Sequence, residues 1–90
     1  MLAPIRTGKF KKEFALAEKR GMNMEKIIEV MDIIINEKSL PPERRNHPLQ
    51  GEWEGAFDCH IQGDWVLIYE PDKMTGIVTF HRTGSHSDLF

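Results

Sequence analysis

The stretch DCHIQGDWVLIY, residues 58–69, organises the fold of this 90-residue chain. Apolar residues alternate with others on both sides of Gln62 and Gly63, which is the pattern of two β-strands. A glycine in a two-residue loop supplies the positive φ that tight hairpin turns need. The stretch therefore predicts a β-hairpin with Gln62-Gly63 as its loop.

This loop position determines which side chains share a face of the hairpin, because directly opposed residues point to the same side of a sheet. One face is apolar and predicted to be buried, and it carries Phe57, Cys59, Ile61, Val66 and Ile68. The other face carries Asp58, His60, Trp65, Leu67 and Tyr69. Because the second face mixes aromatic and titratable side chains, we interpret it as a binding surface.

Length and composition predict one small domain, residues 1–90. The hydrophobic fraction of 40% and the charged fraction of 29% are ordinary for a soluble globular protein. No apolar run approaches the roughly 20 residues of a membrane span, so no membrane partner is expected. The single cysteine, Cys59, cannot form an internal disulfide and is expected to be a buried thiol. We therefore expect a reducing, cytoplasmic setting.

Basic residues cluster, although the formal net charge is only −2. The clusters comprise Arg6, Lys9, Lys11 and Lys12, then Lys19 with Arg20, and Arg44 with Arg45. Such groups are compatible with a nucleic-acid surface. On the clusters alone, solvated faces of helices and loops are the favoured interpretation.

The first half of the chain predicts a short strand at residues 2–6, followed by a helix over residues 8–20. Thr7 is the expected N-cap of this helix, and Gly21 is expected to end it. Apolar residues recur on one helix face at positions i, i+4 and i+7, namely Phe10, Phe14 and Ala17.

A second helix is predicted to begin at Asn23, whose side chain would cap the first turn. Its apolar stripe comprises Ile27, Val30, Met31 and Ile34. It is expected to end by Ser39, since the prolines at positions 41 and 42 cannot continue a helix.

The second half predicts strands after a polar, irregular segment at residues 41–51. The strands span about residues 53–61, 65–70 and 77–82, and residues 83–90 form a tail with little room for regular structure. The element order is β-α-α-β-β-β. We therefore predict an α+β domain in which two N-terminal helices pack on one face of an antiparallel sheet.

All four histidines, both tryptophans and the only tyrosine lie after residue 46. Cleavage of an RNA phosphodiester without metal requires a base for the 2′ hydroxyl, an acid for the 5′ oxygen and positive charge at the phosphate. Imidazoles suit the proton transfers, because their ordinary pKa of about 6.5 lies near working pH. An arginine suits the phosphate.

The candidate catalytic residues on this reasoning are His47, His60, Asp64, Arg82 and His86. Exposed aromatic rings could hold splayed bases by stacking, and the candidates are Trp65, Tyr69 and Phe90. A zinc site built from the same histidines and Asp64 is less favoured, because no close ligand pair such as HxxxH or CxxC is present. His81 is interpreted as structural, and Trp53 as a core or rim residue.

Three motifs at matching spacing also occur in a known toxin family. They are HPLQG at 47–51, DCHIQGDWVLIY at 58–69 and FHRTGSHSDLF at 80–90. Together with the basic first helix they cover essentially the whole chain. The chain resembles the YafQ branch of the RelE/ParE toxin superfamily.

The resemblance implies a small RelE-like fold and a ribosome-dependent mRNA endonuclease, the toxin of a type II toxin–antitoxin system. It implies cleavage of mRNA in the ribosomal A site by 2′ oxygen attack, with no metal or other cofactor. The implied partners are a DinJ-like antitoxin, the ribosome and its mRNA, and operator DNA only through the antitoxin complex.

The resemblance also suggests roles for individual residues. His60 and Asp64 would activate the 2′ hydroxyl, and His86 would deliver a proton. His47 would assist, and Arg82 would stabilise the phosphorane. The residues expected to bind RNA are Trp65, Tyr69, Phe90, Lys9, Lys12 and Arg45.

Two alternatives belong to other functional classes: a ParE-like toxin that poisons gyrase and leaves RNA intact, and a non-catalytic module that binds antitoxin as a corepressor.

Two local features depart from simple expectations. His81 stands where close relatives are expected to carry a carboxylate. If Phe80 is buried, alternation turns Arg82 toward the core as well, and only a strand end or a bulge would free it.

Overall fold

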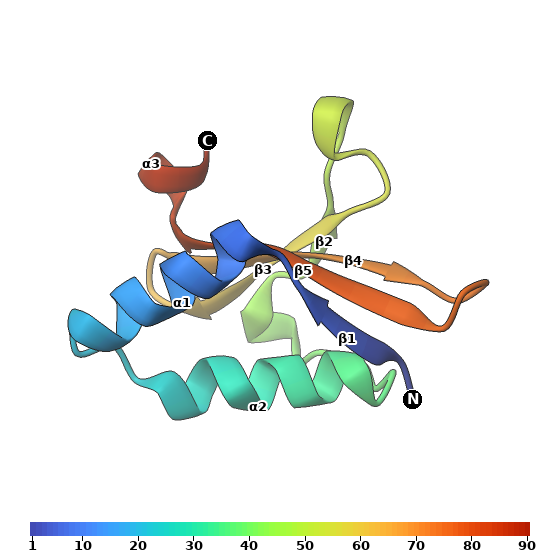
Figure 1. Ribbon diagram of the computed structural model, residues 1–90, viewed down its shortest axis with the longest axis horizontal. Helices are drawn as coiled ribbons and strands as arrows, with labels where there is room; N and C mark the ends of the chain where they lie inside the picture. The colour runs from blue at the N-terminus through green and yellow to red at the C-terminus, as the bar shows by residue number, and fades with distance from the viewer.

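A computed structural model describes residues 1–90, and its elements follow the predicted order (Figure 1). They are β1 (Ala3–Arg6), α1 (Gly8–Lys19), α2 (Met24–Ile35), β2 (His47–Pro48), β3 (Phe57–Gln62), β4 (Trp65–Asp72), β5 (Ile77–Ser85) and α3 (His86–Leu89), with one-turn 3₁₀ helices η1 (Pro42–Arg44) and η2 (Gly51–Trp53). The predicted α+β class is confirmed. None of the helices has the length and apolar character that a membrane crossing requires.

The sheet has five strands in the order β1-β5-β4-β3-β2. β1 pairs in parallel with β5, whereas the other neighbouring strands are antiparallel. The sheet is therefore mixed, which corrects the predicted antiparallel arrangement. α1 and α2 cover one face as predicted, while η2 and α3 lie on the opposite face (Figure 1).

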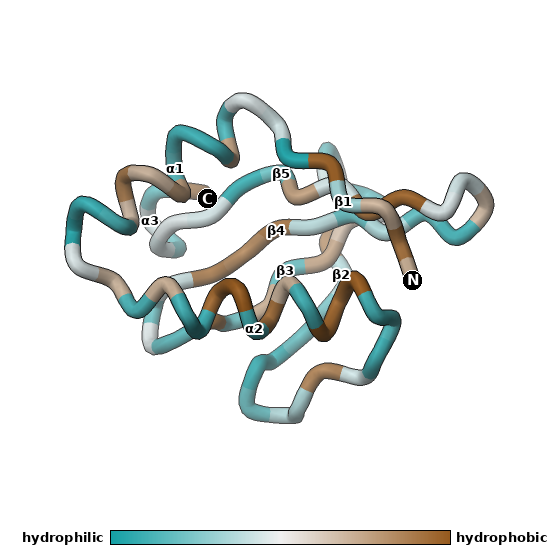
Figure 2. Tube along the Cα trace, turned by 60° about the horizontal axis from the view of Figure 1, so that its bottom comes forward, coloured by the Kyte–Doolittle hydropathy of each residue, from teal (hydrophilic) through white to brown (hydrophobic).

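The main core lies between the sheet and the two long helices. α1 and α2 contribute Phe10, Ala17, Ile27, Val30, Met31 and Ile34, and the strands contribute Cys59, Ile61, Trp65, Leu67, Tyr69, Val78 and Phe80. A smaller cluster on the opposite face comprises Ala56, Val66, Ile68 and Leu89. The central strand β4 is thus covered on both faces, which is why it carries the continuous apolar run seen in Figure 2.

The helix boundaries agree with the sequence, and α2 differs from the prediction only in its N-cap. Thr7 caps α1 as predicted, because its Oγ1 accepts a hydrogen bond from the Phe10 amide at 3.0 Å. Asn23 occupies the N-cap position of α2 but makes no side-chain capping bond, contrary to prediction. α2 ends at Ile35, before Ser39, because Glu37 adopts a left-handed φ of 58° and the following amides bond back to the last turn.

The hairpin register differs from the prediction. His60 lies opposite Val66 and Gln62 opposite Trp65, with a bulge between His60 and Gln62, so Gly63-Asp64 form the turn. The side chains of strand β4 therefore point to the opposite sides of the sheet from those predicted. Val66 and Ile68 share a face with Asp58 and His60, while the helix-side core receives Trp65, Leu67 and Tyr69.

The C-terminal segment is more ordered than predicted. β5 continues to Ser85, and residues 86–89 form α3 rather than an irregular tail. A capping box, in which Ser85 and Asp88 bond to each other's backbone amides, begins this short helix. β5 also has an irregularity at His81, since Arg82 pairs with Ile68 but Phe80 pairs with Tyr69. This bulge frees Arg82 from the core while Phe80 stays buried.

The segment before β3 is only partly as predicted. Residues 41–51 hold η1 and the two-residue strand β2, which pairs His47 with Asp58. The predicted strand at residues 53–61 begins only at Phe57, because η2 occupies the chain up to Trp53.

Candidate active site

Three histidines from separate elements gather on the sheet face opposite α1 and α2. His47 lies on β2, His60 on β3 and His86 on α3. The ring centroids of His60 and His86 are 5.2 Å apart, and the Phe90 ring lies 5.7 Å from His86. The loop before the hairpin and the C-terminal segment therefore fold onto the hairpin, as the sequence predicted.

His86 is held by the hairpin turn. Its Nδ1 lies 3.1 Å from Asp64 Oδ1, and both side chains stay partly exposed. Gly84 lets α3 approach β5, because a Cβ there would lie 3.3 Å from the Asp88 side chain. Asp64 thus contacts His86 and not His60, which revises the pairing expected from the resemblance.

His60 is oriented by the same turn. Its Nδ1 lies 3.3 Å from the carbonyl oxygen of Gly63. A neutral ring that donates through Nδ1–H keeps an unprotonated Nε2. This arrangement can accept a proton from a substrate hydroxyl.

A buried carboxylate lies beneath the cluster. Asp58 is 2% exposed, and its Oδ1 lies 2.8 Å from His47 Nδ1. The His47 ring is better aligned with the Arg45 carbonyl, 3.1 Å away, so Asp58 Oδ1 has no aligned hydrogen-bond donor. Burial raises the pKa of Asp58, while the nearby imidazoles, chiefly that of His47, act to lower it.

Sequence reasoning placed Asp58 on the functional face but gave it no role. Its position two residues before His60 was the available signal, since that spacing puts both side chains on one face of a strand.

Arg82 is engaged by a residue that the sequence did not single out. Its Nε and Nη2 donate to the two carboxylate oxygens of Glu13 on α1, at 2.9 and 2.7 Å. The Thr83 amide donates to the same carboxylate at 3.2 Å. The hydrogen bonds to Glu13 raise the pKa of Arg82. The only signal for Glu13 was its place as a lone acid in the basic run GKFKKEF.

Two of the three predicted stacking residues are buried. Trp65 is 4% exposed, and its Nε1 donates to Thr83 Oγ1 at 2.8 Å. Tyr69 is 5% exposed, stacks on Phe57 and donates its hydroxyl to Asn46. Neither ring offers a free face to a base, because the hairpin register turns both into the core. Phe90 is 59% exposed, so its stacking role stays a prediction.

The predicted RNA-binding cations lie at the surface. Lys9, Lys12 and Arg45 are all exposed. The neighbouring Arg44 is instead structural in part, since its guanidinium donates to the Ile61 carbonyl. Arg44 and Arg45 line a pocket of about 400 Å³ that also includes His60.

The remaining singled-out residues lie outside the cluster. His81 Nε2 is 2.9 Å from Glu70 Oε1, and its ring meets the Trp53 ring edge-on at 5.4 Å. Both residues therefore join β5 to η2, in agreement with their structural interpretation.

Burial raises the pKa of the Cys59 thiol to about 12, so it stays protonated. No group of three or more His, Cys, Asp or Glu residues is arranged to hold a metal ion.

Comparison with known proteins gives a consistent picture. A family model described as "Bacterial toxin of type II toxin-antitoxin system, YafQ" matches residues 2–90. The mRNA interferase toxin YafQ of Escherichia coli strain K12 is 42% identical over 86 residues, which cover 93% of this chain and 90% of that protein.

Solved structures agree with this match. The crystal structure of YafQ from E. coli strain BL21(DE3) has a TM-score of 0.92 at 36% identity, covering 100% of this chain and 99% of that one. A chain in the crystal structure of the E. coli DinJ-YafQ complex has a TM-score of 0.92 at 37% identity, with the same coverage.

Proposed function

This chain belongs to the YafQ family of bacterial type II toxins, and from that premise we propose that it is an mRNA interferase that cuts mRNA in the ribosomal A site. The observation that supports the cleavage chemistry is the cluster of His47, His60 and His86, backed by Asp58 and Asp64. Such a cluster can both accept and donate a proton across one phosphodiester.

In the proposed reaction His60 accepts the proton of the 2′ hydroxyl. The 2′ oxygen then displaces the 5′ oxygen at phosphorus and leaves a 2′,3′-cyclic phosphate. His86 delivers a proton to the departing 5′ oxygen, and Asp64 orients its ring through Nδ1. The roles divide in this way because Asp64 contacts His86, whereas His60 is held by a neutral carbonyl.

Charge on the phosphate is balanced by His47 and Arg82. The ion pair with Glu13 uses only Nε and Nη2 of Arg82, so other N–H groups of the guanidinium remain for a phosphate oxygen. His47 is half exposed above the buried Asp58. Its ring is therefore accessible to a phosphate oxygen.

The proposed partners follow from the relatives and the surface. The E. coli relative is found in a complex with DinJ, and we expect a DinJ-like antitoxin to bind and inhibit this chain. Operator DNA is contacted only through that complex. Lys9, Lys12 and Arg45 are exposed and available to ribosomal RNA and mRNA in the cytoplasm.

The test is cleavage of a defined mRNA on a programmed ribosome. Wild-type protein should cut in the A site and leave a cyclic or 3′ phosphate. His86→Gln should slow cleavage about 10²–10⁴-fold, the usual contribution of a general acid. Its fold should persist, since the side chain is partly exposed. The matched control is His81→Gln, on the same sheet but outside the cluster, which should cut at nearly the wild-type rate.

One result of this assay would contradict the proposed cleavage activity. Folded wild-type protein that leaves ribosome-bound mRNA intact would overturn the proposal, and accompanying gyrase-dependent DNA breaks would support the ParE-like alternative.

A further inference from the structure

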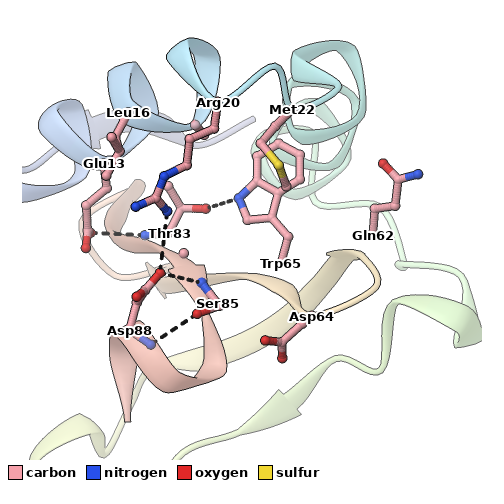
Figure 3. A pocket seen from close by; sticks show the side chains of 12 residues that line it. Glu13, Leu16, Arg20, Met22, Gln62, Asp64, Trp65, Thr83, Ser85 and Asp88 are labelled. Carbon is pink, nitrogen blue, oxygen red and sulfur yellow. Dashed lines mark hydrogen bonds and ion pairs between the residues drawn. The ribbon is translucent and has the colours of Figure 1, made fainter.

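A second pocket adjoins the histidine cluster on the side of Asp64. It has a volume of about 570 Å³ and lies between α1, the hairpin turn and the start of α3 (Figure 3). That size is typical of sites that enclose a small organic ligand. Asp64 lines this pocket and also contacts His86, so a ligand in the pocket is continuous with the candidate active site.

One wall of the pocket is apolar. Leu16 projects from α1 with 44% of its surface exposed, and Met22 and Trp65 line the pocket beside it (Figure 3). The indole N–H is already used by Thr83, so this wall offers no hydrogen bonds. A flat, uncharged ring suits it.

The rim of the pocket carries negative charge. Glu13, Asp64 and Asp88 line the pocket with a single cation, Arg20, and Glu13 is already satisfied by Arg82. Hydrogen bonds from Ser85 lower the pKa of Asp88, which keeps this carboxylate ionised. A phosphate is therefore disfavoured here, whereas a group with N–H donors is favoured.

Two acceptors on this rim are free. The capping bond and the contact with Arg20 both use Asp88 Oδ2, so Oδ1 makes neither. Gln62 makes no side-chain hydrogen bond and lies at the edge of the pocket, beyond Trp65 and Asp64 (Figure 3). Both can accept a hydrogen bond from an exocyclic amino group, the feature that distinguishes cytosine from uracil.

We propose that this pocket receives the nucleobase on the 3′ side of the cleaved phosphodiester and selects bases that carry an amino group. The inference rests on the proposed function and deepens it. The 3′ side follows from Asp64, since His86 protonates the 5′ oxygen of that nucleotide and its base then lies nearest the pocket. Asp88 and Gln62 supply the acceptors that select the base, Asp88 more strictly because a carboxylate cannot donate, and Leu16 forms the platform.

Cytosine and uracil provide a matched pair, because they have nearly the same shape and differ in hydrogen bonding at two adjacent positions: the amino group of cytosine is a carbonyl in uracil, and N3 is an acceptor in cytosine and an N–H donor in uracil. Ribosome complexes should carry either base directly 3′ of the mapped cleavage site. Wild-type protein should cleave the cytosine message about tenfold faster, the lower range of one discriminating base contact. Equal rates would overturn the proposal.

Two exposed apolar residues allow a matched variant and control. Leu16→Glu places a charge on the platform and should remove the preference for cytosine. Ile28→Glu makes the same change on α2, where the side chain is 48% exposed, and should keep the preference. A Leu16→Glu protein that still prefers cytosine would contradict the assignment.

A binding measurement separates this inference from the proposed function. The Met22 methyl signal of wild-type protein should shift on addition of cytidine and much less on addition of uridine, with no ribosome or cleavage involved. This result would support the pocket even if the protein failed to cut mRNA. Absence of a cytidine-induced shift, or equal shifts with both nucleosides, would overturn it.

Discussion

The two pockets beside the histidine cluster differ in charge. The pocket beyond His60 contains Lys26, Arg44 and Arg45 with a single carboxylate, whereas the pocket beyond Asp64 contains three carboxylates and a single arginine. RNA offers both kinds of ligand, since its backbone is anionic and its bases are neutral hydrogen-bonding rings. From this difference we expect a bound strand to place phosphate on the His60 side and a base on the Asp64 side.

Among the substitutions that test this comparison, the largest effect is expected at Arg82, which pairs with Glu13 at the wall of the pocket beyond Asp64. Arg82→Ala should slow mRNA cleavage about 10²–10³-fold, because it removes the donor that we propose for the phosphorane. Arg6→Ala, an exposed arginine on β1, should have little effect under the same assay.

Arg82 also pairs with Glu13, so stability must be measured with cleavage. Arg82→Ala leaves the Glu13 carboxylate poorly compensated and should lower the free energy of unfolding by about 1–3 kcal/mol. Combining Arg82→Gln with Glu13→Gln should recover most of this stability in urea denaturation but not the activity. Full activity in the folded double variant would refute the role of Arg82.

A smaller effect is expected at the basic pocket. Arg45→Gln should weaken binding to ribosome-bound mRNA about tenfold, equally for all codons, and reduce the dependence of binding on salt. Gln is the suitable replacement because residue 45 has a left-handed φ of 47°, which both side chains tolerate equally poorly. A loss of binding that depends on the codon would show that the pocket beyond His60 recognises bases, which would contradict the proposed difference between the two pockets.

In the pocket beyond Asp64, we expect substitutions to change the selectivity for bases and not the overall rate of cleavage. Gln62→Ala should reduce the preference for cytosine over uracil a few-fold, to the extent that one neutral hydrogen bond contributes. Cleavage of the uracil message should remain near the wild-type rate. Equal losses on both messages would assign Gln62 to general RNA binding.

The smallest effect concerns Asp58 beneath the cluster. Burial raises its pKa above the ordinary value of 3.8, so its contribution to stability is fully present below that value and is lost as pH rises through the folded pKa. The His47 imidazolium opposes this shift. His47→Gln should therefore raise the pKa of Asp58 further and enlarge the stability lost with rising pH.

Carboxyl-carbon NMR and denaturation over a pH series can measure this change. His81→Gln should leave the Asp58 titration as in wild type, because His81 faces Glu70 instead. A pKa of Asp58 that falls in His47→Gln would show that the two groups do not interact as described.

Local patterns predicted the helices well. The Thr7 cap and the apolar stripes are encoded within a few residues, and their physical causes act over one or two helix turns. The histidine set was also predictable, because residue type and motif spacing carry it. The hairpin register could not be predicted in this way. Gln62-Gly63 and Gly63-Asp64 both place a glycine in the turn, and the alternation of apolar residues does not reveal a bulge.

The sequence by itself determined the family, the fold class and the identity of the titratable groups, because these depend on residue types and their order. The tertiary structure alone decided which groups meet. Glu13 and Arg82 are 69 positions apart, and Asp64 and His86 are 22 apart. Their contacts depend on one bulge at His81, one glycine at position 84 and the closing of α1 over the sheet edge. Such contacts arise from packing, which no local pattern records, and they shape the pocket that Glu13 and Asp64 line.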